Sequence, residues 1–328
     1  MARIVLIGGS GHVGTYLVPA LADRGHDVVN VSRGTAAPYR PHPAWKTIKH
    51  VVMDRTDEES KGTFGSRIAA LDADIVIDMI SFELEGTQQL VQALHGRVEH
   101  YLFCSSIWVY GHATSIPTTE VDRPNAIDTY GVNKAKIEGW LLQQARRNGF
   151  PATCFRPGHI VGEGWVPINP LGNVNPEVFA SIARGEELAL PNLGLETVHH
   201  VHADDVAQWI IRAIENRVAT IGEAFNTVSA QALTLRGFAE AMYRWFGREP
   251  RLSFLPFEQW KLGLKKSDAD ASWGHIMRSS CVSIEKSRRQ LGYAPRYTSL
   301  DAVQESVAAL IACGRISIPK NEATTGPA

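Results

Sequence analysis

The sequence predicts an α/β fold, a doubly wound parallel sheet with a smaller C-terminal lobe. Short apolar runs alternate with helix-length amphipathic stretches through about the first 160 residues, which is typical of repeated βα units. A glycine-rich turn directly follows the first apolar run. From Pro157 onward, glycine, proline and asparagine crowd together, and this change of composition marks the start of the second lobe.

The expected elements follow these patterns along the chain. In the first lobe we expect strands at 3–7, 27–32, 47–53, 75–80, 100–105 and 152–156, and helices at 13–23, 86–95 and 130–147. Further on, we expect strands at 197–201 and 224–228 and helices at 178–184, 203–216, 235–246, 285–291 and 300–312. These elements predict a first lobe of residues 1–157, to which the segment near 197–228 returns, a second lobe of residues 158–314, and a frayed tail of residues 315–328.

The composition is that of an ordinary globular enzyme. Apolar residues make up 44% of the 328 residues, charged residues 20%, and the formal net charge is -1, so neither nucleic acid nor a membrane is an expected partner. The first apolar run is too short for an export signal. Four cysteines without a CxxC pair indicate neither a zinc site nor a disulfide framework, and favour the reducing cytoplasm.

The glycine turn contains Gly8, Gly11 and Gly14 in the spacing GxxGxxG, between a buried strand and a helix. In such a turn the glycines allow a tight bend, a close approach of backbone N–H groups to a pyrophosphate, and close packing of helix on strand. The start of the helix then faces the phosphates. The pattern predicts a dinucleotide site, and the alternative is a glycine-rich turn without a ligand.

The end of the second strand indicates which dinucleotide binds. An NAD enzyme usually offers a carboxylate to the ribose hydroxyls there, whereas this chain has Ser32 and Arg33. A hydroxyl and a guanidinium can hold a 2′-phosphate, which favours NADP and leaves NAD possible. Alternatively, Arg33 is a solvated loop residue or stacks on adenine. Asp54, after the third strand, either accepts a hydrogen bond from the adenine amino group or caps a helix.

Tyr130 and Lys134 are four positions apart in a helical segment, so they share one face of the helix. Hydride transfer at a carbinol carbon needs a proton acceptor, and we expect the ammonium to lower the phenol's pKa from its usual value of about 10. Ser106 follows the fifth strand, where ligands bind in open α/β sheets, and Ser105 competes with it for the same role. The alternative for the YxxxK pair is a chance pair on a helix surface.

Together these motifs resemble the extended short-chain dehydrogenase/reductase family, in particular its NAD-dependent epimerase/dehydratase branch. The markers are GxxGxxG, SSIWVYG at 105–111, YxxxK, RPG at 156–158, HVHADDVA at 200–207, SIEK at 283–286 and LGYAP at 291–295. The resemblance covers nearly the whole chain. It implies a Rossmann fold, Ser106 as the catalytic serine, Tyr130 as the acid/base, Lys134 as its electrostatic partner, and a homodimer formed through the helices at 86–95 and 130–147.

Three departures narrow what the resemblance implies. Ile107 and Trp108 stand where dehydratases of the family have an Asp-Glu pair, which disfavours dehydration. The segment 78–82 replaces the usual Ala-Gly-rich cofactor loop, and Glu85 replaces an expected asparagine. His159 occupies a position where nucleotide-sugar epimerases commonly have an asparagine, which weakens the assignment of a UDP-sugar.

The candidate site residues fall into two groups. The expected cofactor contacts are Gly8, Ser10, Gly11, His12, Val13, Gly14, Ser32, Arg33, Asp54, Arg55, Met79, Ile80, Ser81, Tyr130, Lys134 and Pro157. The expected substrate contacts are Ser106, Ile107, Trp108, His159, Asn173, Asn175 and Arg278. Structural alternatives remain for the last four: a buried histidine, turn-forming asparagines and a surface charge. Of His199, His200 and His202, only the last two share a strand face, so helix entry is favoured over metal binding.

The sequence therefore predicts a cytoplasmic NAD(P)-dependent reductase or epimerase acting on a sugar or nucleotide-sugar. The alternative is a non-catalytic dinucleotide-binding regulator or RNA-associated protein on the same fold.

Overall fold

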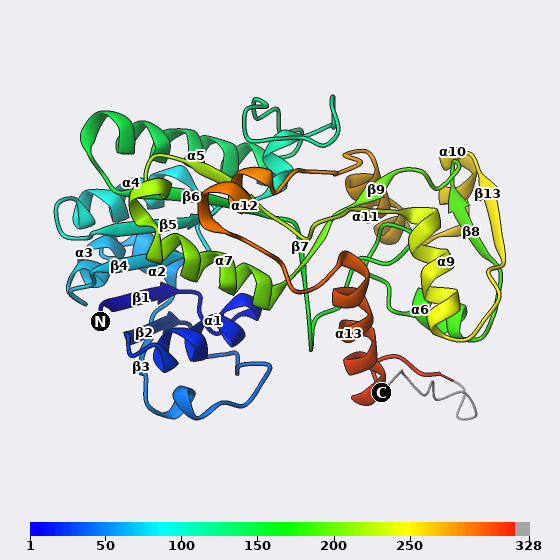
Figure 1. Cartoon of the computed structure of the whole chain (residues 1–328), viewed down its shortest axis with the longest axis horizontal. Helices are drawn as coiled ribbons and strands as arrows, with labels where there is room; N and C mark the ends of the chain where they lie inside the picture. Colours follow the sequence, from blue (N-terminus) through cyan, green and yellow to red (C-terminus); the bar gives the residue numbers. More distant parts are fainter. Residues whose placement is uncertain (319–328) are drawn as a thin grey trace.

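A seven-stranded parallel sheet forms the centre of the computed structural model, which describes residues 1–318 (Figure 1). Its strand order is β11-β6-β5-β4-β1-β2-β3. The strands are β1 (Arg3–Ile7), β2 (Asp27–Ser32), β3 (Lys49–Val52), β4 (Ile75–Asp78), β5 (His100–Cys104), β6 (Ala152–Pro157) and β11 (Ala224–Thr227). Every pairing between them is parallel, so the doubly wound fold predicted from the alternating pattern is confirmed.

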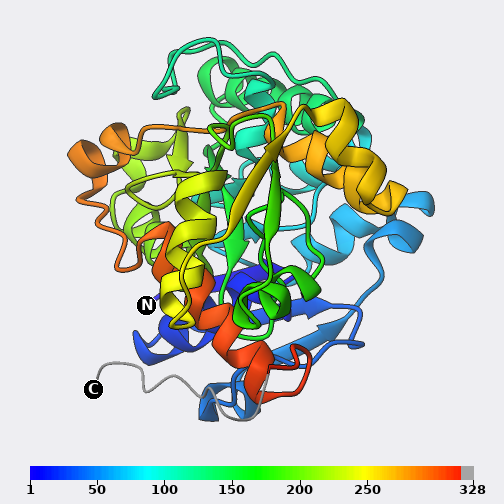
Figure 2. The same cartoon turned by 90° about the vertical axis from the view of Figure 1, so that its right-hand side faces the viewer.

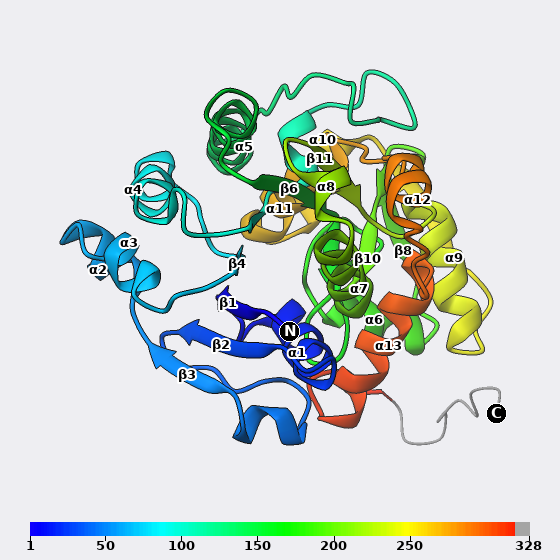
Figure 3. The ribbon, with the colours of Figure 1, turned by 60° about the vertical axis from the view of Figure 1, so that its left-hand side comes forward.

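Helices cover both faces of this sheet (Figure 3). One layer contains α1 (His12–Asp23) and α7 (Ala203–Glu215), and the other contains α3 (Phe64–Ala69), α4 (Leu84–Leu94) and α5 (Thr129–Asn148). The strands are apolar on both sides for this reason: in β1, Ile4 and Leu6 belong to one core cluster, and Val5 and Ile7 belong to the other. α2 (Arg55–Ser60) follows β3 directly.

A second lobe extends from the carboxyl end of the sheet and occupies the right-hand end of Figure 1; Figure 2 turns it toward the viewer. It contains α6 (Glu177–Ala183), β8 (Leu188–Pro191), α9 (Leu235–Trp245), β13 (Leu252–Leu255), α10 (Phe257–Trp260), α11 (Lys266–Ile276) and α13 (Ser299–Ala312). These elements pack around a core of their own that includes Phe179, Phe238 and Leu310. β11, which lies between these elements in the sequence, pairs with β6 in the central sheet.

The remaining elements are short. They are β7 (His159–Val161), β9 (Thr197–Val198), β10 (His200–His202), α8 (Arg217–Thr220), β12 (Leu233–Thr234), α12 (Glu285–Leu291) and the 3-10 helices η1 (Pro43–Lys46), η2 (Ile107–Tyr110) and η3 (Lys261–Gly263). β7 pairs with β10, and β9 pairs with β12. The single strand expected at 197–201 is therefore two strands that pair with different partners, interrupted at His199.

The predicted frayed tail is wrong for its first residues. Ile316 is 3% exposed and packs in the second core, so apolar contacts hold the chain beyond α13. The rest of that tail, residues 319–328, lies outside the described residues. Within 1–318, no helix is both long and apolar enough to cross a lipid bilayer.

Candidate active site

The glycine turn joins β1 to α1 in a conformation that only glycine adopts easily. Gly8 has a φ of 88° and donates its N–H to Val31 O at 2.8 Å. A Cβ on Gly14 would lie 1.8 Å from Gly9 O, so the helix packs against the turn at a distance that excludes any side chain. The N-cap of α1 is Gly11, which has no side chain to cap the helix. The first N–H groups of α1 are thus open to an anionic ligand, which fits a pyrophosphate.

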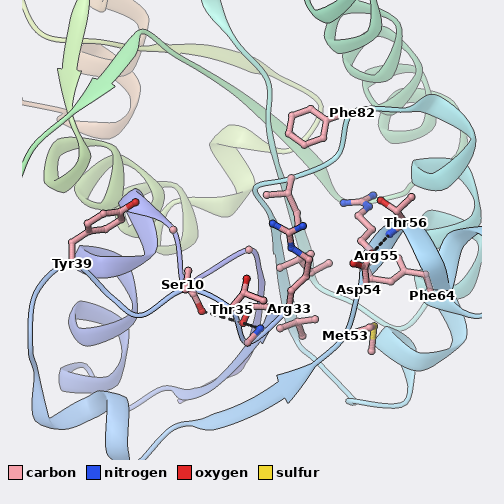
Figure 4. Close-up of a pocket in the computed structure, with 18 residues that line it drawn as sticks. Ser10, Arg33, Thr35, Tyr39, Met53, Asp54, Arg55, Thr56, Phe64 and Phe82 are labelled. Carbon is pink, nitrogen blue, oxygen red and sulfur yellow. Dashed lines mark hydrogen bonds between the residues drawn. The ribbon is translucent and has the colours of Figure 1, made fainter. Parts of the chain in front are cut away.

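A cavity of about 380 Å³ opens beside this turn, between the end of β2 and the start of α2 (Figure 4). A chain of hydrogen bonds fixes its hydroxyl groups: Asn30 Nδ2 donates to Ser10 Oγ at 2.9 Å, and Ser10 Oγ donates to Ser32 Oγ at 3.1 Å. Arg33 lies between Thr35 and Asp54 in the lining. Its guanidinium makes no ion pair with any of residues 1–318, so it is available to an anion in the cavity.

Asp54 and Arg55, which follow β3 after Met53, form hydrogen bonds within the protein. Asp54 lines the cavity and caps α2, since its carboxylate accepts from Thr56 N at 3.0 Å. Arg55 also lines the cavity, but its guanidinium donates to Asp78 at 2.7 Å and to Glu59 at 2.7 Å. The capping role foreseen as an alternative for Asp54 is therefore present, and Arg55 braces β4 against α2.

A second cavity of about 530 Å³ begins at the same glycine turn and runs into the second lobe. Ser106, Tyr130 and Lys134 all line it. Their supports differ: Ser106 follows β5, whereas the other two lie in the first turns of α5, which Asp128 caps by accepting from Gly131 N at 2.7 Å. The carboxyl end of β5 and the amino end of α5 thus bring a hydroxyl, a phenol and an ammonium to one wall.

Hydrogen bonds fix Lys134 and Ser106 in place. The ammonium of Lys134, whose residue is 1% exposed, donates to Ser81 O at 2.8 Å and to Cys104 O at 2.7 Å. Ser106 Oγ accepts from Trp108 N at 3.2 Å, as the cap of η2. Ser81 was expected to contact cofactor directly, but it lies outside both cavity linings and acts through its carbonyl on Lys134.

Burial dominates the electrostatics of this wall. Burial raises the pKa of the Tyr130 phenol to about 12, while the Ser106 hydroxyl acts in the opposite direction. Burial also lowers the pKa of Lys134. Burial, not the Lys134 ammonium, therefore has the largest effect on the phenol's pKa, and the expected net lowering is not found. The phenol is protonated at neutral pH and is ready to donate a proton.

The far end of the second cavity is aromatic. Trp108 lies edge-on to Tyr130, to His159 and to His275, with ring centroids 5.9, 6.3 and 5.4 Å apart. Trp165 lines the cavity nearer the glycine turn, where it stacks on His12 with ring centroids 5.0 Å apart. Because a phenol, an indole and two imidazoles meet here, this end offers apolar faces and a few neutral polar atoms to a substrate.

Ile107 and Arg278 are not part of the cavity lining. Ile107 is 3% exposed and packs in the core of the first lobe, so its side chain points away from the cavity. The guanidinium of Arg278 lies 3.8 Å over the Trp108 ring and pairs with Asp128. Neither side chain lines the cavity, so their role as substrate contacts stays a prediction.

Asn173 and Asn175 are likewise used within their own loop. Asn173 is fully buried, donates to Ser272 Oγ at 3.1 Å and accepts from Asn175 N at 3.0 Å. Asn175 donates to Asp268 at 3.1 Å and accepts from Glu177 N at 3.1 Å. These hydrogen bonds stabilise the turn before α6, which is the alternative role expected for the two asparagines, and a contact with substrate stays a prediction.

The three neighbouring histidines have structural roles. His199 accepts from Val282 N at 3.2 Å and faces Ser229 O at 3.0 Å, while His200 faces Ile168 O at 3.2 Å. His202 caps α7 by accepting from Asp204 N at 3.1 Å. Across the described part of the chain, no group of three metal-ligating side chains comes together.

Several lining residues were not foreseen. Thr35 and Tyr39 follow β2, and Phe82 follows β4, where loop positions show no periodic pattern. His275 lies on α11, a helix that sequence patterns did not predict, and reaches the cavity only because the second lobe folds back over the sheet. Of these residues, only Phe82 could have been found from the sequence, because it lies in the segment 78–82 that replaces the usual cofactor loop.

The parallel sheet and the glycine turn place the chain among the extended short-chain dehydrogenases/reductases. Residues 4–227 match the family model described as the NAD dependent epimerase/dehydratase family. The chain belongs to this family, which is NAD(P)-dependent.

The proteins to which this chain is similar are named for different functions. The chain is 26% identical over 314 residues to the chloroplast stem-loop binding protein of 41 kDa b of Arabidopsis thaliana, covering 93% of this chain and 78% of that protein. It is 25% identical to a 3-beta-hydroxysteroid dehydrogenase of Mycolicibacterium neoaurum, covering 93% and 90%. The UDP-glucose 4-epimerase of Thermotoga maritima, solved with UDP-glucose, has the same fold, with a TM-score of 0.72, 21% identity, and coverage of 95% and 99%.

Proposed function

We propose that this protein is an oxidoreductase or epimerase that acts on a hydroxyl or carbonyl group of a sugar-like substrate. The observation that carries the proposal is that Ser106, Tyr130 and Lys134 line one cavity, which begins at the glycine turn. Gly8, Gly11 and Gly14 would hold a dinucleotide along the turn, and its nicotinamide would supply or accept the hydride. Oxidoreductases and epimerases of this family share that requirement.

The three side chains supply the proton chemistry. Tyr130, protonated at neutral pH, gives its proton to the substrate oxygen during reduction and takes it back during oxidation. Ser106 hydrogen-bonds the same oxygen and orients it. Lys134, fixed by two carbonyl groups, places a positive charge beside the phenol and stabilises it when it loses its proton. The lining of the second cavity contains no carboxylate among the described residues, which argues against elimination of water.

We propose NADP as the preferred cofactor. The lining of the adenosine end contains the unpaired guanidinium of Arg33 and the hydroxyl of Ser32, and these groups suit a 2′-phosphate. Asp54 lines the same cavity, but its carboxylate is engaged as the cap of α2. We further propose a homodimer with α4 and α5 at its interface, as the family resemblance implies, and a location in the cytoplasm, which the unpaired cysteines favour.

Replacement of Tyr130 tests the proposal most directly. Tyr130→Phe keeps the ring and removes the hydroxyl, so we expect kcat to fall at least about 1000-fold, within the range of a lost general acid. The dissociation constant for NADPH should stay within about threefold of wild type. Tyr297→Phe is the matched control, because Tyr297 stacks on His202, outside both cavity linings. Turnover that survives in Tyr130→Phe contradicts the assignment.

A second candidate is an RNA-associated role, favoured by the name of the Arabidopsis relative. Titration of a stem-loop RNA into the purified protein distinguishes the RNA-associated role from the oxidoreductase or epimerase. Tight, salt-dependent RNA binding without hydride transfer to any carbonyl compound would favour the second candidate. The convergence of Ser106, Tyr130 and Lys134 favours the first.

A further inference from the structure

The substrate end of the second cavity has almost no ionic groups. Among the described residues that line this cavity, Lys134 is the only lysine or arginine, and its ammonium already donates to two backbone carbonyl groups. Arg278 is behind Trp108, where its side chain is 3% exposed and its guanidinium pairs with Asp128. A phosphate or carboxylate on the substrate would find no free cation in this space, and burial of an uncompensated charge is costly.

Two neutral imidazoles supply the polar atoms instead. The rings of His159 and His275 are 4.9 Å apart, and burial lowers the pKa of each. His275 Nδ1 lies 2.7 Å from Gly172 O, so it carries the proton and leaves Nε2 as an acceptor. The ring of His159 has no hydrogen bond to any of residues 1–318, although it lines the cavity. A neutral imidazole can both donate to and accept from a hydroxyl or carbonyl group.

Apolar side chains make up the rest of this end. Val166, Ile168 and Val174 line the cavity from the long loop between β7 and α6. Trp108 lies next to Tyr130, with ring centroids 5.9 Å apart, so an indole borders the position of the reacting oxygen. Such walls suit the apolar face of a ring-shaped substrate.

We propose that the substrate is an uncharged cyclic alcohol or ketone, without a phosphate or carboxylate group, that packs against Trp108 and forms a hydrogen bond with His159. This inference rests on the proposed function and narrows its substrate class. This substrate class excludes nucleotide-sugars, because the diphosphate of a nucleotide-sugar needs cationic or N–H partners in its binding site.

Binding and turnover by the full-length protein, saturated with NADPH, test the inference. The neutral probes are a methyl 4-keto-pyranoside and 4-tert-butylcyclohexanone, and the charged probes are UDP and UDP-glucose. We expect at least one neutral ketone to be reduced with saturation kinetics. Calorimetry should give dissociation constants above about 1 mM for UDP and UDP-glucose.

A variant pair links the result to the imidazole. His159→Phe keeps a ring and removes the polar atoms, so the KM for the neutral ketone should rise about tenfold, the effect of one hydrogen bond. The conservative variant His159→Asn should restore part of that loss. The dissociation constant for NADPH should not change in either. His95→Phe is the matched control, since His95 is exposed and lies after α4, outside the cavity lining.

The possible outcomes are distinct. Binding of UDP or UDP-glucose with a micromolar dissociation constant overturns the inference, and so does failure of both neutral ketones to saturate the protein, measured by calorimetry. An unchanged KM in His159→Phe overturns the role of His159. Failure of the proposed function has a different signature, because NADPH would then not bind or Tyr130→Phe would leave turnover intact.

Discussion

We propose that the side chains at the end of β2 favour NADP at the adenosine end of the site. Ser32 is already oriented by Ser10, 3.1 Å away, and Arg33 has no partner of opposite charge within the described chain. A 2′-phosphate would provide that partner. The proposed preference for NADP rests on this unpaired cation and on the lack of an aspartate or glutamate directly after β2.

Arg33→Ala therefore should change cofactor preference. We expect the KM for NADPH to rise at least about tenfold, because a charge-assisted hydrogen bond contributes about 1.5–3 kcal/mol, while the KM for NADH stays within about twofold. Steady-state kinetics with both cofactors measure this ratio. Arg97→Ala is the control, since Arg97 is an exposed residue of the loop before β5. Equal losses with NADPH and NADH would contradict phosphate recognition.

Residues near regular elements were predictable from the sequence, and residues held by tertiary contacts were not. Tyr130 and Lys134 follow from helical spacing, and Ser106 from the end of a strand. His275 could not be foreseen, because it reaches the cavity from a different lobe. Arg278 was misjudged for a related reason: its stacking on Trp108 depends on how α11 lies against the first lobe, which no local pattern encodes.

At the scale of elements, the contact between β1 and α1 shapes the phosphate site. The start of α1 can face a pyrophosphate only if the helix lies close to the turn. Because Gly14 has no Cβ, the helix comes closer to the turn than any other residue would allow. Gly139 in the middle of α5 offers a contrast, since a Cβ there would meet no atom within 4 Å. Packing therefore requires glycine at position 14, whereas it does not require glycine at position 139.

Alanine at these two positions should act in opposite directions. In Gly14→Ala the new Cβ would lie 1.8 Å from Gly9 O, so the turn must shift. We expect the protein to lose stability and NADPH affinity together, the latter at least about tenfold. Gly139→Ala should raise the free energy of unfolding by about 0.4–1 kcal/mol, because alanine favours the helix. Urea unfolding and NADPH titration measure both, and a harmless Gly14→Ala would contradict the packing argument.

Long elements were predictable because their pattern of apolar residues continues over several helical turns or along a whole strand. The helix expected at 130–147 is α5, Thr129–Asn148, and the strand expected at 27–32 is β2, Asp27–Ser32. α11, which has 11 residues, was missed. Short elements such as α2, α3 and α10 were missed too. Their few residues carry no complete hydrophobic period, and caps and tertiary packing, such as the Asp54 cap of α2, decide whether they form.

Considered as a whole, the molecule buries several histidines in their neutral form at the places where its parts meet. His100 lies in the sheet core, with its Nε2 2.8 Å from Thr153 Oγ1, while His199 and His200 lie between the two lobes. Burial lowers the pKa of His100 to about 3, of His199 to about 4 and of His200 to about 3. The folded protein therefore resists proton uptake at sites that the unfolded chain protonates readily.

The stability of the whole molecule should consequently fall as the pH decreases from 7.5 to 5.5. In the unfolded chain these imidazoles titrate near pH 6.5, whereas in the folded state they stay neutral down to about pH 4 or 3. Below about pH 6.5 the unfolded state thus binds more protons, and each histidine can lower the free energy of unfolding by up to about 1.4 kcal/mol per pH unit. Urea unfolding at both pH values measures the difference. His100→Gln should reduce the pH dependence, and an unfolding free energy that is the same at both pH values would show that these imidazoles are not held neutral by the fold.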